Sequence, residues 1–303
     1  MRTKKKSTPA PVASKGTQLK VTENTELMTF LLAKMGGMSR TSIKSLLAHR
    51  QVMVNNKICT QFNQELQPND NIFISSNRGN TELQHPKLKI LFEDQYLIVV
   101  EKKEGLLTVS TGNAEETTAF SILKNHVKKG STQNRIYVVH RLDRETSGIL
   151  VFAKTKEIQL AMQEHWHEIV TRRVYVALVE GKVEKTSDTI ITWLTENEKS
   201  LKIHSSVVDN GGQQAVTHYR VIKSNDNFSL LEVELETGRK NQIRVHLQGL
   251  GHPIVGDKKY GSGSTVLGRV GLHARILAFV HPMSLENVSF ETSVPRNFLN
   301  IFH

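Results

Sequence analysis

A short stretch near the middle of the chain carries the residues best suited to chemistry. Residues 140–148 read His-Arg-Leu-Asp-Arg-Glu-Thr-Ser-Gly, with a short apolar run on either side. Apolar runs of this length are typical of buried strands, and Thr-Ser-Gly is typical of a turn. We therefore expect Asp143 to lie on a loop between two strands, close to His140, Arg141 and Arg144.

Asp143 is the candidate reactive group of this loop. Neighbouring cations favour the charged form of a carboxylate, so this side chain is expected to stay ionised. An ionised, positioned aspartate suits the role of a nucleophile or an anchor and is a poor general acid. Structural ion pairs use the same residue types. A surface turn that is merely held by ion pairs therefore remains open as the alternative.

A second candidate segment lies about 100 residues further along the chain. Residues 237–244 read Thr-Gly-Arg-Lys-Asn-Gln-Ile-Arg, follow a predicted strand and open a predicted helix over residues 241–250. Arg239 and Arg244 therefore lie near a helix N-terminus, which favours anions. On these residues alone, ordinary surface arginines and phosphate positioning without chemistry also remain open.

The elements around these segments indicate the fold class. Predicted strands cover residues 136–139, 149–152, 174–179, 217–222, 229–236, 273–280 and 288–291, and predicted helices cover residues 156–167 and 241–250. Strands outnumber helices without strict alternation, which is typical of an α+β fold with a largely antiparallel sheet. We expect this sheet to form one large domain over residues 87–303.

The chain before this domain divides into three parts. Residues 1–22 are rich in Lys, Ser and Pro and are predicted to be a disordered basic tail. Residues 23–77 contain two predicted helices followed by two predicted strands, and Ser39 is placed to cap the second helix, at residues 40–48. Residues 78–86 are polar, contain Gly and Pro, and are predicted to be a linker.

Charge and composition limit the class of protein. The 303 residues carry a formal net charge of +11 and are 38% hydrophobic. A basic chain with a basic tail is typical of a partner of nucleic acid. No apolar run is long enough to cross a membrane, and the N-terminus lacks the apolar core of a secretory signal. The single cysteine, Cys59, excludes an internal disulfide, so we expect a cytoplasmic protein.

The motif at residues 140–148, followed by Ile-Leu-Val-Phe-Ala-Lys, resembles the signature of the RluA-type pseudouridine synthases. Further blocks in the expected order are T-G-R-x-x-Q-I-R at residues 237–244, G-D-x-x-Y-G at 256–261 and L-H-A at 272–274. The resemblance implies a domain with an active-site cleft that isomerises uridine in structured RNA.

The resemblance also assigns roles to individual residues. It implies that Asp143 is the catalytic nucleophile, that Arg244 forms an ion pair with it, and that Tyr175 contacts the flipped base and is a candidate for removing its proton. It further implies that His140, Arg141 and Arg239 contact RNA.

The chain departs from the family pattern at four positions. Glu101 and Lys103 replace the usual Asn and Pro, Arg173 replaces a Lys two residues before Tyr175, and Asn241 replaces the His of the T-G-R block.

Residues 23–77 resemble a second family, the small alpha-L RNA-binding module first seen in a small-subunit ribosomal protein. The matching residues are Ser39-Arg40 before the second helix and Val-Met-Val-Asn at residues 52–55. This resemblance implies that Arg40, Lys44 and Arg50 face phosphate, where such contacts supply affinity rather than sequence choice.

Together these patterns predict a monomeric, cytoplasmic RNA pseudouridine synthase that uses neither a cofactor nor a metal, because the isomerisation involves no net redox change. An alpha-L module joined to this domain favours large-subunit ribosomal RNA as the target. A tRNA-directed synthase and a non-catalytic RNA-binding ribosome-assembly protein remain open. A hydrolase of the glycosidase type is also open, although such enzymes use a second carboxylic acid and Glu145 is too close in sequence to be an obvious partner.

Overall fold

The computed structural model describes residues 16–48, 51–55, 57–75, 83, 85–110, 112 and 116–302. The chain divides into two compact units. The first takes in the chain up to Leu83 together with Lys128–Asn134, and the second takes in Gln84–Val127 and Arg135–His303. The division at Leu83 falls within the predicted linker at residues 78–86. None of the helices in the described ranges has both the length and the apolar character needed to cross a bilayer.

The first unit is built from short elements that enclose a small apolar core. They are β1 (Gly16–Lys20), β2 (Thr25–Glu26), α1 (Leu27–Lys34), α2 (Arg40–Ala48), β3 (Val52–Val54), β4 (Lys57–Ile58), β5 (Glu65–Leu66) and β6 (Asn71–Ser75). Four of the strands form an antiparallel sheet in the order β1-β6-β3-β4, and β2 pairs with β5. Leu27, Leu31 and Ile43 from the helices share one buried cluster with Val52 and Ile72 from the sheet.

The second helix of this unit has the predicted bounds and the predicted cap. It begins at Arg40, directly after Ser39. The hydroxyl oxygen of Ser39 accepts a hydrogen bond from the backbone N–H of Ser42 at 3.1 Å, which satisfies one of the free donors at the helix start.

Strand β1 corrects the predicted disordered tail over its last residues. This strand pairs antiparallel with β6 along its whole length, and Val21, which follows it, is buried in the core of the unit. A Cβ at Gly16 would lie 2.5 Å from the carbonyl oxygen of Ile74, so glycine fits this close approach. The polar composition of this segment did not predict a strand. Backbone hydrogen bonds, which do not depend on apolar side chains, attach it to the sheet. Residues 1–15 of the predicted tail lie outside the described residues.

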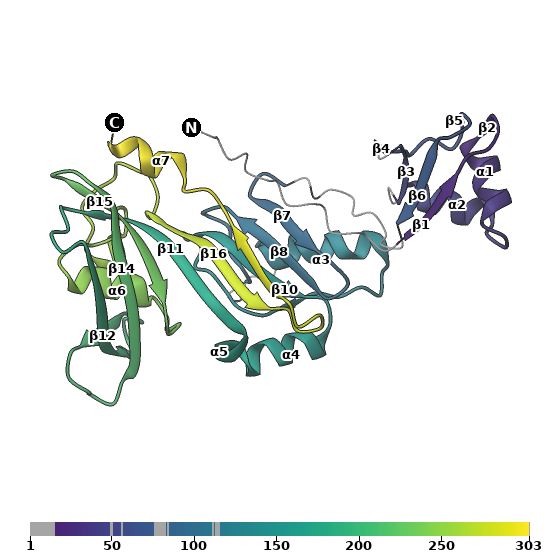
Figure 1. Ribbon diagram of the computed structural model, residues 1–303. Coiled ribbons are helices and arrows are strands. Elements are labelled where there is room, and N and C mark those ends of the chain that lie inside the picture. The colour runs from purple at the N-terminus through teal and green to yellow at the C-terminus, as the bar shows by residue number, and fades with distance from the viewer. Residues whose placement is uncertain are drawn as a thin grey trace. The chain divides into compact units, whose positions relative to one another are not determined.

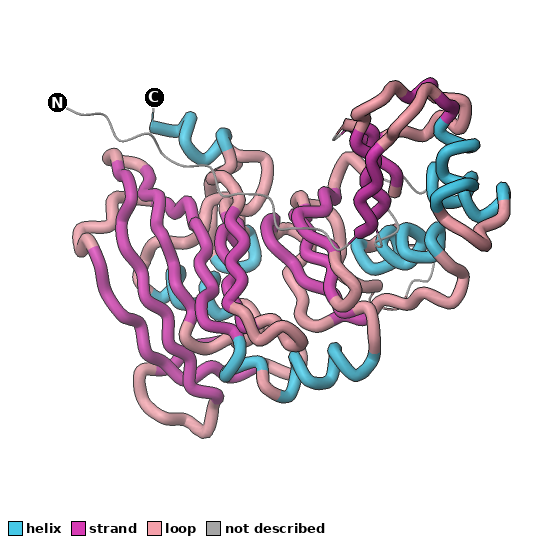
Figure 2. Tube along the Cα trace, turned by 45° about the vertical axis from the view of Figure 1, so that its right-hand side comes forward, coloured by secondary structure: helices cyan, strands magenta, loops and turns pink. Residues whose placement is uncertain are grey.

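The second unit is dominated by an 11-stranded sheet (Figures 1 and 2). Its strands are β7 (Leu88–Glu93), β8 (Leu97–Lys102), β9 (Tyr137–Val138), β10 (Ser147–Ala153), β11 (Val170–Glu180), β12 (Ser187–Glu196), β13 (Ile203–Ser206), β14 (Gln213–Ser224), β15 (Phe228–Leu235), β16 (Leu272–Val280) and β17 (Asn287–Glu291). Nine of them follow the order β13-β12-β14-β15-β11-β16-β10-β8-β7, while β17 pairs with β16 and β9 pairs with β10. The β10–β16 pairing is parallel and the other named pairings are antiparallel, which confirms the predicted α+β class.

Helices flank this sheet. They are α3 (Ala119–Gly130), α4 (Lys156–Glu164), α5 (Trp166–Ile169), α6 (Gln242–Gly249) and α7 (Arg296–Leu299), with 3-10 turns η1 (Lys258–Tyr260) and η2 (Asn300–Phe302). The prediction of one continuous helix over residues 156–167 is wrong, because the chain leaves helical geometry at His165. After the break, the half-buried Trp166 packs against the core beside β10 and β11. Helix α3 was not predicted.

Two features of the sheet fix the segments that matter below. Gly148 lies at the parallel junction of β10 and β16 with φ +119°, and a Cβ there would lie 2.1 Å from the carbonyl oxygen of Ala274. The loop that ends at β10 is therefore held directly against β16. On the α6 side, Ile243 and Leu247 are buried with Ala177 of β11 and Val233 of β15, which fixes the helix against the sheet.

Candidate active site

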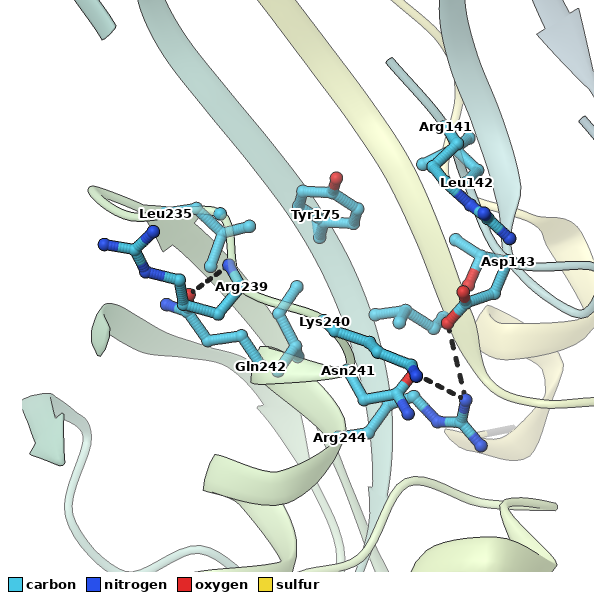
Figure 3. A pocket seen from close by; sticks show the side chains of 14 residues that line it. Arg141, Leu142, Asp143, Tyr175, Leu235, Arg239, Lys240, Asn241, Gln242 and Arg244 are labelled. Atoms are coloured by element: carbon cyan, nitrogen blue, oxygen red, sulfur yellow. Dashed lines mark hydrogen bonds and ion pairs between the residues drawn. The ribbon is translucent and has the colours of Figure 1, made fainter. Parts of the chain in front are cut away.

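A cavity of about 510 Å³ opens between the β9–β10 loop, β11 and the start of α6 (Figure 3). Its walls are made by Arg141, Leu142, Asp143, Thr146, Tyr175, Leu235, Gly238, Arg239, Lys240, Asn241, Gln242, Ile243, Arg244 and Leu272. All of these residues belong to the second unit. The structure thus brings together both segments that the sequence singled out, and the volume is in the range of small-molecule pockets.

Asp143 lies on the loop between β9 and β10, as predicted. Two hydrogen bonds to Thr108 hold this loop in place. The hydroxyl of Thr108 donates to the carbonyl oxygen of Leu142 at 2.8 Å and accepts from the N–H of Leu142 at 3.1 Å. The N–H of Thr146 donates to the carbonyl oxygen of Asp143 at 3.2 Å and closes the turn. The side chain of Asp143 is 43% exposed and faces the cavity.

A buried lysine that the sequence reasoning did not single out also supports this loop. Lys102 is 0% exposed at the end of β8 and donates hydrogen bonds to the carbonyl oxygens of Lys103, Leu106 and Arg144. Burial, reinforced by the charge of Arg269, lowers the pKa of Lys102 from its ordinary 10.5 to about 8. The signal in the sequence was a lysine that ends an apolar strand.

Arg244 lies on α6 and contacts two carboxylates, those of Asp143 and Asp257. Its Nη1 lies 3.4 Å from Oδ2 of Asp143, so the ion pair that the resemblance implied is present. Its Nε and Nη2 donate to Oδ2 and Oδ1 of Asp257 at 2.6 and 2.7 Å. Burial acting alone would lower the pKa of Arg244, but the hydrogen bonds and charge of Asp257, with the charge of Asp143, raise it above its ordinary value.

Asn241, which stands where the family has His, links Arg244 to Tyr260. Its backbone adopts the left-handed conformation with φ 56°, which asparagine tolerates better than most residues. Its Oδ1 accepts from Nη1 of Arg244 at 3.2 Å, and its Nδ2 donates to the phenol oxygen of Tyr260 at 3.1 Å. The guanidinium of Arg244 in turn lies 5.0 Å from the ring centroid of Tyr260.

Tyr175 projects from β11 into the cavity and lies, in the view of Figure 3, between Leu235 and Asp143. Burial raises the pKa of its phenol, the charge of Arg173 opposes that rise, and Asp143 adds to it. A neutral ring suits stacking on a planar base, whereas direct removal of a proton requires a phenolate that this environment disfavours.

Two of the predicted RNA contacts line the cavity. Arg141 is exposed on the β9–β10 loop, and Arg239 lies on the opposite wall, where its Nε donates to the carbonyl oxygen of Gln214 at 3.2 Å. The exposed Lys240, which the sequence analysis did not select, lies beside Arg239 on the same wall.

His140 does not line the cavity, and the structure gives it a packing role instead. Its Nε2 accepts a hydrogen bond from the N–H of Val151 at 3.1 Å, and its ring lies 4.9 Å from the ring of Trp166. Burial, followed by the charge of Arg173, lowers the pKa of His140 to about 3. A neutral imidazole that is already hydrogen-bonded to the backbone does not attract phosphate through charge, so an RNA contact of His140 stays a prediction.

The remaining predicted RNA contacts belong to the first unit. Arg40 and Lys44 are exposed on α2, and the Nζ of Lys44 lies 5.4 Å from the ring centroid of Phe62. Arg50 lies outside the described residues.

Gln242 is a site-supporting residue that the sequence reasoning missed. Its Nε2 donates to the carbonyl oxygen of Val216 and to the hydroxyl of Thr217, at 2.9 and 2.8 Å. Its Oε1 accepts from the hydroxyl of Thr237 and from the N–H of Arg239, both at 2.9 Å. Because this buried amide satisfies all four of its hydrogen bonds, it fixes the wall that carries Arg239.

The chemistry of the lining is a carboxylate, an aromatic ring and several cations around a cavity. Asp143 is the sole acid among the lining residues, all of which lie in the described chain. A glycosidase-type site would use a second carboxylic acid across the cavity. The lining therefore favours a nucleophile acting without an acid partner, surrounded by groups that attract phosphate.

Comparison with known proteins gives a consistent result. The sequence pattern of the RNA pseudouridylate synthase family matches residues 96–249. The chain is 34% identical to the uncharacterised RNA pseudouridine synthase YhcT of Bacillus subtilis, over 87% of this chain and 88% of that protein. It is 40% identical to the ribosomal large subunit pseudouridine synthase D of Nitrosomonas europaea, over 69% of this chain and 62% of that protein. Among solved structures, the human RNA pseudouridylate synthase domain containing 4 superposes with a TM-score of 0.57 at 27% identity, over 69% of this chain and 90% of that one.

Proposed function

The chain belongs to the RNA pseudouridylate synthase family and is an RNA isomerase, and from this premise we propose that it converts uridine to pseudouridine in large-subunit ribosomal RNA, with Asp143 as the nucleophile. One observation carries the assignment of Asp143. Its partly exposed carboxylate faces a cavity of about 510 Å³ and accepts a hydrogen bond from Arg244.

The reaction moves one glycosidic bond. The bond between uracil N1 and ribose C1′ breaks, the base turns, and a bond forms between C5 and C1′. The C5 proton is released and N1 gains a proton, so the product is an isomer of the substrate. The carboxylate of Asp143 attacks directly or assists the departure of the base, and it is regenerated when the new bond forms. Arg244 directs Nη1 at this carboxylate, where a fixed charged donor suits an acidic partner.

Tyr175 stacks on the uracil. Its ring lines the cavity beside Asp143, and the raised pKa of its phenol favours this role over direct proton removal. A uridine within folded RNA must first leave its stack, which costs a few kcal/mol. The exposed side chain of Arg141 borders the cavity from the β9–β10 loop and is placed to fill the vacated space, while Arg239 holds a neighbouring phosphate.

The first unit supplies affinity for a large RNA. In this proposal residues 23–77 form the RNA-binding module, where Arg40, Lys44 and Arg50 contact phosphate, and residues 87–303 form the catalytic domain. The relative from Nitrosomonas europaea is named for the large ribosomal subunit, which supports that target over tRNA. We also propose that the enzyme is a monomer and that it acts in the cytoplasm, where an RNA substrate and a single cysteine are at home.

A tritium-release assay tests the activity. The substrate is RNA from cells that lack this protein, labelled with tritium at uracil C5, and the product nucleosides are separated by chromatography. We expect tritium release matched by pseudouridine, at positions that map to large-subunit ribosomal RNA. No release would indicate a non-catalytic binding protein, free uracil would indicate a hydrolase, and sites confined to tRNA would overturn the proposed target.

A further inference from the structure

Asp257 is a second carboxylate bound to Arg244, and its hydrogen bonds to the guanidinium are shorter than the one made by Asp143. Both of its oxygens accept hydrogen bonds from the guanidinium, at 2.6 and 2.7 Å, in the two-pronged arrangement that arginine forms best with carboxylates. The side chain of Asp257 is 1% exposed, so it does not meet solvent and does not line the cavity. It is not available to touch a substrate.

The backbone around Asp257 is also fixed in position. Gly256 has φ +78°, and a Cβ there would lie 2.2 Å from the carbonyl oxygen of Arg269, so the chain turns at a position that suits glycine. The 3-10 turn η1 follows at once, and the N–H of Tyr260 lies 3.3 Å from Oδ1 of Asp257. The turn that presents Asp257 therefore has little freedom to shift.

The remaining sides of the guanidinium are also occupied. Tyr260 lies against one face, and Oδ1 of Asn241 accepts from Nη1. With Nε and Nη2 engaged by Asp257, Nη1 is the nitrogen of Arg244 that is turned to Asp143.

We propose that Asp257 is a positioning residue for the isomerisation: it fixes the guanidinium of Arg244 so that Nη1 is directed at Asp143. The inference rests on the proposed function. Asp257 also balances the charge of Arg244, so that Arg244 serves Asp143 more as an oriented donor than as an uncompensated cation. Displacing a reacting group by about 1 Å costs on the order of a hundredfold in rate, which is the effect expected when this anchor is removed.

The test is the full-length Asp257→Asn variant under single-turnover conditions, with RNA from cells lacking the protein, labelled at uracil C5. We expect the rate at saturating enzyme to fall about a hundredfold, while the enzyme concentration for half-saturation stays within about threefold of wild type. The matched control is Glu93→Gln, which breaks another buried ion pair, with His126 and Lys154. This control is expected to lower the melting temperature without lowering the rate of the folded protein.

A double-mutant cycle separates positioning from a general structural role. If Asp257 acts through Arg244, adding Asp257→Asn to Arg244→Gln lowers the rate no further, within about threefold. The double variant also keeps the inference testable if Asp257→Asn alone does not fold. It leaves no unpaired buried charge, so we expect it to fold and its rate to be measurable. Additive losses, or failure of the double variant to fold where Arg244→Gln folds, would overturn the inference.

The outcomes also separate this inference from the proposed function. Wild-type protein that releases no tritium would overturn the proposed function and the inference with it. Active wild type with an Asp257→Asn rate within about threefold of it would overturn the inference alone.

Discussion

Two carboxylates share one guanidinium, and they differ in burial and geometry. Asp257 is 1% exposed and meets Arg244 through two short hydrogen bonds, at 2.6 and 2.7 Å. Asp143 is 43% exposed and meets the same guanidinium through one contact of 3.4 Å. A fully engaged, buried carboxylate stabilises an arrangement, whereas a loosely held one at a cavity keeps lone pairs available for a substrate. The comparison indicates which acid orients and which acid reacts.

The largest effect on activity is expected from replacing Asp143. Replacing Asp143 with Asn removes the nucleophile but keeps the shape of the side chain, so we expect pseudouridine formation to fall to background. RNA binding should stay within about tenfold of wild type, equivalent to about 1.4 kcal/mol. Glu145→Gln is the matched control, because it removes an exposed acid from the same loop that does not line the cavity. Turnover by Asp143→Asn comparable to that of wild type would remove this residue from the mechanism.

Tyr175, which lines the same cavity from β11, supplies the next test. If Tyr175 stacks on the base, Tyr175→Phe keeps most of the activity, whereas Tyr175→Leu loses on the order of 10- to 100-fold, because stacking on an aromatic ring is worth about 1–3 kcal/mol per base. Single-turnover rates of the two variants decide between the roles. Equal, large losses in both variants would instead assign the phenol oxygen to proton removal.

The first unit should matter for binding and little for chemistry. Deleting residues 1–77 removes Arg40, Lys44 and Arg50, and we expect affinity for large RNA to fall roughly tenfold and its salt dependence to weaken. The remaining chain should fold and keep its catalytic rate at saturation. Filter binding at two salt concentrations and a thermal melt measure these effects. An unfolded or inert fragment would contradict the proposed independence of the catalytic domain.

The smallest effect on activity is expected at His246, a buried group away from the cavity lining. It lies between the hydroxyls of Thr192 and Thr217, at 2.9 Å from each, and burial lowers its pKa from 6.5 to about 4. The unfolded chain therefore binds more protons between pH 6.5 and pH 4. The stability associated with neutral His246 is full above pH 6.5 and is lost as the pH falls through that window, by about 3 kcal/mol at most.

The measurement is the free energy of unfolding against pH for wild type and His246→Gln. The variant should show a shallower loss of stability between pH 6.5 and pH 4, with its rate at neutral pH unchanged. Parallel curves for the two proteins would contradict the assigned protonation state.

The sequence predicted the parts of the site that depend on local motifs. The loop of Asp143 follows from turn residues between two apolar runs, and the start of α6 follows from helical periodicity. The contact between Asp143 and Arg244 joins residues 101 positions apart and came from family resemblance, not from spacing.

Other features depended on packing that no local pattern encodes. The G-D-x-x-Y-G block was visible, but the partner of Asp257 is set by how its turn lies against α6. Strand β1 could not be predicted from its polar composition, because backbone pairing with β6 holds it in the sheet. Helix α4 ends at Glu164, because His165 leaves helical geometry at a point that the periodicity of the apolar residues did not reveal. The inward position of His140 likewise follows from Trp166 and the backbone of Val151.

The division of roles between the two carboxylates is tested most directly by one ratio, the single-turnover rate of Asp257→Asn divided by that of Asp143→Asn on the same RNA. We predict a measurable rate for Asp257→Asn, about a hundredfold below wild type, and a background rate for Asp143→Asn. Equal rates for the two variants, or a faster reaction in Asp143→Asn, would contradict the account.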